Sequence, residues 1–288
     1  MAWECGNGLR GGPVRSYAHT MVNPPNSATA SNVESSELNL LERYHVLMDR
    51  VAAAAERSGR SAKDIIVVLV SKYGTLEQIR ELVGAGHLHF GESRSQQLEQ
   101  RAAQIAEWLE RTREIGSVGS DALPDAVNWH MIGHLQRNKA KKAVQHARLI
   151  QTVDSLRLAE EIQTAAARRD RPVEVLIQVN VTGEPQKKGI APPAVRHLID
   201  QVETMVNVQV RGLMAMGEHT DDADSIRRTF EHCQELFEEI ATKNTLGGRF
   251  NILSMGMSND YEIAIECGSN CIRVGSAVFQ DEGKPVTE

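Results

Sequence analysis

The chain has 288 residues, of which 41% are hydrophobic and 24% are charged, and its formal net charge is −6. This composition is typical of a soluble globular protein that can bury a large core, and the acidic balance offers no broad basic surface for a nucleic acid. The four cysteines are too few for a disulfide framework, and no apolar run reaches the about 18 residues of a membrane-spanning helix. We therefore expect a cytoplasmic protein without nucleic-acid or membrane partners.

The first 35 residues differ in texture from the rest of the chain. They are rich in Gly, Pro, Ser and Asn, show no sustained periodicity and lack the apolar segment of a signal peptide. The composition predicts a disordered extension over residues 1–35 and one folded domain over residues 36–288. A biological start at Met21 is an alternative interpretation of the same segment.

Hydrophobic periodicity predicts a regular alternation of strands and helices. A first helix runs from about residue 36 to Gly59, and residues 65–70 form an apolar, β-branched run typical of a strand buried on both faces. Strands are predicted at 65–70, 88–90, 128–132, 149–153, 173–180, 208–216, 250–255 and 271–279. Helices are predicted at 75–83, 96–111, 139–146, 156–169, 195–206, 226–240 and 261–267, with a loop at 112–126.

The count and order of these elements indicate the fold class. Eight strands, of which the first seven are each followed by a helix, are what a single TIM-type (β/α)₈ barrel of the α/β class requires. The helix before the first strand is then an extra N-terminal helix. A doubly wound open sheet is the alternative, and it fits poorly because the first turn is not rich in glycine.

The active site of such a barrel lies at the C-terminal ends of its strands, which directs attention to Lys72. This lysine follows the first apolar run. Taken alone, a lysine at that position most often extends its amine into solvent. A desolvated amine at the same position could instead form a Schiff base with a carbonyl compound.

The ends of the seventh and eighth strands carry small and hydroxylated residues where barrels frequently bind phosphate. The motifs are Ser254-Met-Gly-Met-Ser258 and Gly275-Ser276. Ser258 or Asn259 is expected to cap the following helix, whose N-terminus favours an anion. Either motif alone could equally be a turn or a cap without a ligand.

Other polar residues give weaker signals. His130 and His134 are four residues apart on a strand end rather than a helix, and Cys267 and Cys271 have no second pair, so no metal site is predicted. The basic residues between Arg137 and Lys142 are more typical of a solvated helix start than of a nucleic-acid site. Arg273, inside a barrel strand, must have a partner, and a neighbouring carboxylate is one candidate.

Taken together, these motifs make residues 38–280 similar to the pyridoxal 5′-phosphate (PLP) homeostasis protein family, also called the proline synthase co-transcribed family. Members of that family are single-domain proteins that resemble the barrel domain of alanine racemase. The matching segments are Val70-Ser-Lys72, Phe90-Gly-Glu92, Trp129–Gln136, Val153-Asp-Ser155, Gln178-Val-Asn180, Gly189-Ile190, Arg211–Met214, Ser254–Ser258 and Arg273–Ser276.

The resemblance implies that the cofactor PLP is held as a Schiff base on Lys72, with Arg273 facing the pyridine nitrogen. Arginine keeps its proton, so the ring would be a weak electron sink. The family usually has Asn at position 93 and Thr at position 73, and this chain departs from it with Ser93 and Tyr73. The phosphate-binding residues implied are Ser254, Gly256, Ser258, Gly275 and Ser276, and the other pocket residues are Met214, Asn180, His130 and Ser93.

The function implied is PLP binding in intracellular vitamin B6 homeostasis and amino-acid balance, by a monomer that supplies PLP-dependent apo-enzymes and has no established turnover. The alternative is a racemase-like PLP enzyme. A racemase needs an acid/base on each face of the cofactor, and we expect no second domain here because only about nine residues follow the last predicted strand. A third hypothesis, a PLP-independent sugar-phosphate enzyme, needs carboxylates at strand ends, where only Glu92 qualifies clearly.

Overall fold

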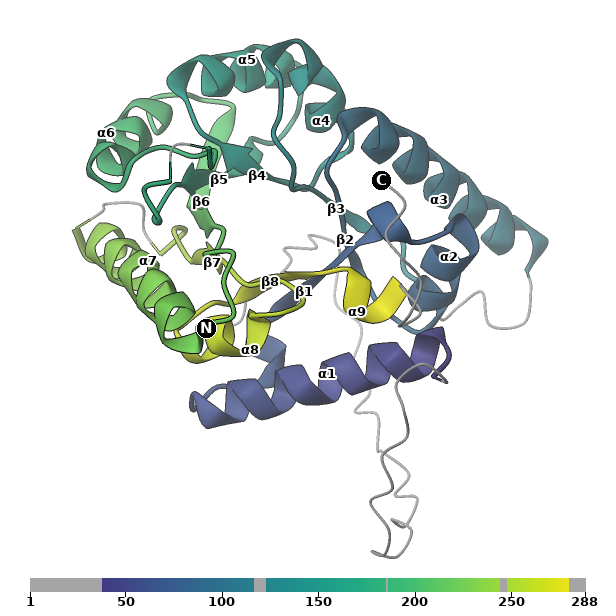
Figure 1. Cartoon of the computed structure of the whole chain (residues 1–288). Coiled ribbons are helices and arrows are strands. Elements are labelled where there is room, and N and C mark those ends of the chain that lie inside the picture. The colour runs from purple at the N-terminus through teal and green to yellow at the C-terminus, as the bar shows by residue number, and fades with distance from the viewer. Residues whose placement is uncertain (1–37, 117–122, 185, 244–247, 280–288) are drawn as a thin grey trace, which may run out of the picture.

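The computed structural model describes residues 38–116, 123–184, 186–243 and 248–279. The predictions for residues 1–35, and for Cys5 and Met21 within them, lie outside the described residues. The eight strands form one closed parallel barrel in chain order, and β1 pairs with both β2 and β8. Figure 1 shows the ring of strands surrounded by helices. The predicted TIM-type barrel is therefore confirmed.

The bounds of the elements follow the predicted alternation. The strands are β1 (Ile66–Val70), β2 (His89–Glu92), β3 (Asn128–Met131), β4 (Leu149–Val153), β5 (Val173–Val179), β6 (Val208–Ala215), β7 (Ile252–Ser254) and β8 (Cys271–Val274). The helices are α1 (Leu40–Arg57), α2 (Leu76–Gly84), α3 (Ser95–Ile115), α4 (Ala140–His146), α5 (Leu156–Ala166), α6 (Pro192–Val202), α7 (Ala223–Lys243), α8 (Tyr261–Glu266) and α9 (Ser276–Phe279). None of the helices in the described residues is long and apolar enough to cross a membrane.

Each strand buries both of its faces, which explains the continuous apolar runs in the sequence. In β1, Val67 and Leu69 belong to the large core between the barrel and its helices, whereas Val68 belongs to a separate inner cluster. The members of the inner cluster come from six strands and fill the middle of the barrel: Val68, Leu149, Leu176, Met214, Ile252 and Cys271. The barrel is thus a packed core rather than a channel.

The extra N-terminal helix α1 lies against the last βα unit, beside α8 in Figure 1. Asn39 caps it through a capping box with Glu42. Arg50 and Arg57 form ion pairs with Glu262 of α8, and Arg43 Nε donates to the carbonyl of Val278 in α9 at 2.9 Å. The beginning of the described chain is therefore attached to its end.

Several predicted boundaries differ from the structure, and the end of the barrel differs most. The eighth strand was expected to reach Phe279, but it ends at Val274 and residues Ser276–Phe279 form α9. The chain leaves the barrel wall because the amides of Val278 and Phe279 both donate to the carbonyl of Gly275. The Phe279 ring then lies 2.5 Å from where a Cβ at Gly74 would be, so it covers the turn after β1. In the segment predicted as a loop at 112–126, α3 continues to Ile115.

Candidate functional site

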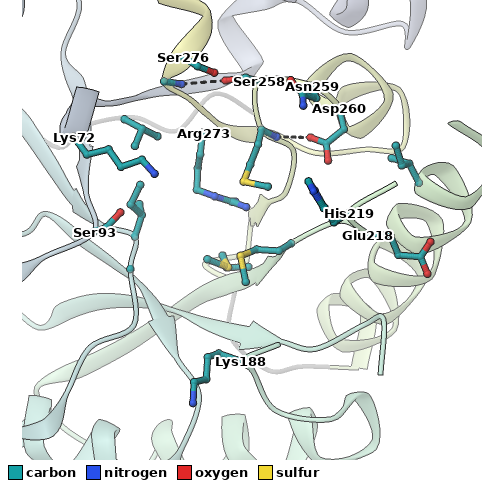
Figure 2. Close-up of a pocket in the computed structure, with 18 of the residues that line it drawn as sticks. Lys72, Ser93, Lys188, Glu218, His219, Ser258, Asn259, Asp260, Arg273 and Ser276 are labelled. Carbon is teal, nitrogen blue, oxygen red and sulfur yellow. Dashed lines mark hydrogen bonds between the residues drawn. The ribbon is translucent and has the colours of Figure 1, made fainter. Parts of the chain in front are cut away.

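A cavity of about 780 Å³ lies at the C-terminal ends of the barrel strands. Its wall includes Lys72 after β1, Ser93 after β2, Ser258 after β7 and Arg273 on β8. Figure 2 shows Lys72 and Arg273 pointing into the same space, with Ser258 and Ser276 close together beside it and Lys188 on the far side. Residues predicted from the ends of different strands therefore line one continuous cavity.

Lys72 lies in a one-turn 3₁₀ helix, Ser71–Tyr73, directly after β1. Its side chain is exposed to the cavity, and Nζ is 4.3 Å from the centroid of the Tyr73 ring. Within the part of the chain that the structure describes, Nζ forms no hydrogen bond and no ion pair. The amine is thus held by one aromatic contact and is accessible to a ligand.

Arg101 of α3 holds the turn that carries Lys72. The Arg101 guanidinium donates to the carbonyl of Ser71 and, at 2.9 Å, to that of Gly74, and it lies 3.0 Å from Glu92 Oε1. Ser71 Oγ donates to the same Glu92 oxygen at 2.7 Å. Because Arg101 sits within a long helix and outside every motif, sequence reasoning did not detect it.

Arg101, Ser71 and Glu92 form a clamp under the Lys72 turn. Glu92 itself does not line the cavity. Its side chain is fully buried; burial raises the pKa of the carboxyl, and Arg101 and Ser71 act in the opposite direction. The phosphate-enzyme hypothesis relied on Glu92 as its clear strand-end carboxylate. The clamp gives that carboxylate a structural partner instead.

Arg273 lies on β8 with 5% of its surface exposed. One terminal nitrogen donates to Ser254 Oγ at 2.6 Å and the other to the carbonyl of Ala215 at 2.8 Å. Burial lowers the pKa of the guanidinium, which still remains a cation at neutral pH. Among the described residues no carboxylate forms an ion pair with it. The structural ion pair considered as an alternative is therefore not what holds Arg273.

The residues predicted to bind phosphate fall into two groups. Ser258, Gly275 and Ser276 line the cavity, and the amide of Gly275 donates to Ser258 Oγ at 3.3 Å. Ser254 and Gly256 do not line it. Ser254 is completely buried beneath Arg273. At Gly256, whose φ is 97°, an added Cβ would lie 2.6 Å from Ala264 Cβ, so only glycine allows the chain to pass this close to α8.

The predicted cap of the next helix was wrong. The N-cap of α8 is Asp260, not Ser258 or Asn259. The amides of Asp260 and Tyr261 both donate to the carbonyl of Met257, and this turn delays the start of the helix. Asp260 Oδ1 accepts from the Met257 amide at 2.5 Å, and burial raises the pKa of this carboxyl. The carboxyl stabilises the turn that presents Ser258.

Of the other predicted pocket residues, Met214 and Ser93 line the cavity, whereas Asn180 and His130 do not. Asn180 organises the loop after β5: its Nδ2 donates to the carbonyl of Glu184 at 2.9 Å and its Oδ1 accepts from the amide of Gly183 at 3.1 Å. His130 is 1% exposed and lies in the barrel interior.

Gln178 also lines the cavity, although the sequence indicated it only as part of the segment Gln178-Val-Asn180 that matches the family. Gln178 is 3% exposed, and its Nε2 donates to the carbonyl of Lys188 at 3.3 Å. Its Oε1 has no hydrogen-bond partner among the described residues. A buried acceptor without a donor is costly, and a ligand that carries a donor would satisfy it.

The comparisons with known proteins agree with this geometry. The sequence model of the alanine racemase N-terminal domain family matches residues 47–282. The pyridoxal phosphate homeostasis protein of Aquifex aeolicus is 33% identical over 84% of this chain and 98% of the relative. The protein of the same name from Schizosaccharomyces pombe is 34% identical over 83% of this chain and 93% of the relative. This chain belongs to the pyridoxal phosphate homeostasis protein family.

Solved structures separate this family from more distant barrels. PipY of Synechococcus elongatus, solved with PLP bound, is 32% identical, covers 81% of this chain and 99% of its own, and has a TM-score of 0.65. An alanine racemase of Clostridium difficile is 12% identical, has a TM-score of 0.56 and is matched over 57% of its length. The racemase similarity shows a common fold. These matches confirm the resemblance to the pyridoxal phosphate homeostasis family that the sequence motifs indicated.

Proposed function

We propose that this chain binds PLP as a Schiff base on Lys72 and acts in PLP homeostasis. The observation that carries the proposal is the presence of two basic side chains in one cavity: the accessible amine of Lys72 and the buried Arg273, which forms no ion pair with a carboxylate of the described residues. The relatives that match nearly their whole length to this chain are named for the same role.

The residues of the cavity fit the chemistry of PLP. The volume of about 780 Å³ is within the range of about 300–1,000 Å³ usual for small-molecule sites. Lys72 would take the aldehyde, Ser258, Gly275 and Ser276 would take the phosphate, and Arg273 would face the pyridine nitrogen. When bound, PLP would supply a reactive aldehyde that the cavity withholds from other amines.

Arg273 favours a carrier over an enzyme. A guanidinium donates a hydrogen bond but does not give up its proton, so the ring nitrogen opposite it stays unprotonated. Without that proton the ring withdraws electrons weakly, which disfavours steps that build a carbanion. Tyr73, the tyrosine in the described lining, contacts Lys72 itself, so it does not supply an acid/base on the opposite face.

The wider role follows from this chemistry. A protein that holds a reactive aldehyde keeps its free level low and can pass it to PLP-dependent apo-enzymes, which links it to amino-acid balance. We place this role in the cytoplasm and assign it to a monomer without nucleic-acid partners, on the sequence features given above.

Titration of the purified protein with PLP tests the proposal. We expect a visible chromophore that saturates at one PLP per chain, and return of activity when the loaded protein is mixed with an apo PLP-dependent enzyme. In deuterated water, exchange of an amino acid's α-proton should be no faster than with free PLP. The absence of a chromophore would refute the proposal, and steady α-proton exchange would favour the racemase-like alternative.

A further inference from the structure

A continuous row of hydrogen-bonded side chains crosses the interior of the barrel from β2 to Arg273 on β8. His89 Nδ1 is 3.0 Å from His130 Nε2, and His130 Nδ1 is 3.0 Å from Gln151 Nε2. Gln151 Oε1 is 2.7 Å from Ser254 Oγ, which is 2.6 Å from Nη1 of Arg273. Five strands contribute one residue each, and the last four residues are at most 5% exposed.

The chemistry of the groups fixes the direction of every hydrogen bond in this row. Arg273 can only donate, so Ser254 Oγ accepts from it and its own proton points to Gln151 Oε1. Gln151 Nε2 then donates to His130 Nδ1, which places the proton of His130 on Nε2, facing His89 Nδ1. All the donors point away from Arg273, and an acceptor lone pair faces the guanidinium.

All the members of the row other than Arg273 are neutral at physiological pH. Burial lowers the pKa of His130 well below its ordinary value and lowers that of His89 to about 4. A carboxylate beneath Arg273 would hold the guanidinium but cancel its charge. Neutral, aligned hydrogen bonds hold it without cancelling the charge, and bonds in such a row polarise one another.

We propose that Gln151, acting through Ser254 and backed by His130, is a positioning residue that fixes the orientation of Arg273 through neutral hydrogen bonds. Asp260, which lines the same cavity, also acts on Arg273 electrostatically but forms no hydrogen bond with it. Gln151 does not line the cavity, so it acts on a ligand only through Arg273. The proposed role toward PLP rests on the proposed function, because Arg273 must face the ring nitrogen. The row itself is present in the protein without a ligand.

Arginine NMR of the PLP-free protein tests the row directly. In the wild type, two acceptors hold the Arg273 guanidinium, so its two terminal nitrogens should rotate slowly and give separate resonances. Gln151→Leu and Ser254→Ala should merge or exchange-broaden them, and Ser254→Thr, which keeps a hydroxyl, should restore them. Thr229→Ala is the matched control, since it removes a buried hydroxyl that donates to the carbonyl of Ser225 within α7, away from the row.

Spectroscopy of the PLP-loaded protein tests the consequence. In Gln151→Leu and Ser254→Ala we expect the pH midpoint of the bound chromophore to shift by about one unit and PLP to bind about tenfold more weakly. The Thr229→Ala control should leave both quantities unchanged. If both Gln151→Leu and Ser254→Ala left the Arg273 resonances and the pH midpoint of the chromophore unchanged, the inference would be overturned. A wild type that binds no PLP would instead refute the proposed function, while the NMR comparison would still decide whether the row exists.

Discussion

Arg101 controls how Lys72 is presented to the cavity although it does not line the cavity itself. It joins two carbonyls of the Lys72 turn to the buried Glu92, so the turn and the carboxylate are held by one side chain. A buried carboxylate that loses its cation is left with an uncompensated charge, which is strongly destabilising. The position of Lys72 therefore depends on a residue in the middle of α3.

Replacing Arg101 with Met should show this dependence. We expect Arg101→Met to lower the free energy of unfolding by about 3 kcal/mol, because Glu92 stays buried without its partner. PLP binding should weaken about tenfold, because the Lys72 turn loses two hydrogen bonds. Urea unfolding and PLP titration measure the two effects.

The double variant Arg101→Met/Glu92→Gln is the control for this prediction. It removes both charges, so it should recover much of the stability but little of the PLP affinity. If the single variant matched the wild type in both measurements, the clamp would have no role.

Several residues of the site could be predicted from their positions at strand ends. Lys72, Met214, Ser258 and Arg273 share one cavity because parallel barrel strands end on the same side. Ser254 belongs to the same motif as Ser258, yet it points into the barrel interior and pairs with Gln151. Which face a residue of a fully buried strand takes cannot be deduced from apolar runs, so the row beneath Arg273 was not predictable.

At the scale of elements, the docking of α1 on the barrel depends on His87, which precedes β2. The Tyr44 hydroxyl of α1 is 3.3 Å from His87 Nδ1, and His87 Nε2 is 2.8 Å from the carbonyl of His89. Nε2 must donate to that carbonyl, so in the neutral ring Nδ1 accepts from the Tyr44 hydroxyl. Burial lowers the pKa of His87 from its ordinary value of 6.5 to about 4.

This lowered pKa predicts acid sensitivity. Between about pH 6.5 and about pH 4 the unfolded chain binds a proton at His87 that the folded chain does not, so stability falls as the pH falls. One such group contributes a slope of about 1.4 kcal/mol per pH unit in that window. In His87→Gln the slope should be smaller by about that amount, measured by urea unfolding at several pH values from neutral to acid. Equal slopes in the two proteins would show that His87 is not the group that titrates.

The element order was predictable, whereas the end of the barrel was not. Eight buried runs separated by helical periodicity specify the alternation, and the structure confirms all eight strands. Residues 277–279 are apolar and include the β-branched Val278, which is typical of a strand, but together with Ser276 they form α9. The reversal depends on Phe279 packing over Gly74, a contact between positions far apart in the sequence.

At the scale of the whole molecule, the barrel is the unit shared with the relatives. This chain covers 98% of the Aquifex aeolicus protein but 57% of the Clostridium difficile racemase. The extension over residues 1–35 remains a prediction from composition. The capping box at Asn39 starts α1, and the carbonyl of the preceding Leu38 accepts a hydrogen bond from Arg43.

Removing residues 1–35 therefore should leave the barrel intact. We expect a chain that begins at residue 36 to keep the melting temperature and the PLP affinity of the full chain, since α1 retains its cap and its contacts with α8. Thermal unfolding and PLP titration of both chains make the comparison. A clear loss of either property would assign the extension to the fold or to the site.

The most direct test of the central claim is borohydride reduction of the PLP-loaded protein, followed by mass mapping of the modified lysine. We expect reduction to remove the visible chromophore and to leave one pyridoxyl group on Lys72. In Lys72→Ala neither the chromophore nor the adduct should form. A pyridoxyl group found only on lysines outside the cavity, such as the exposed Lys63, with Lys72 unmodified, would refute the Schiff base on Lys72.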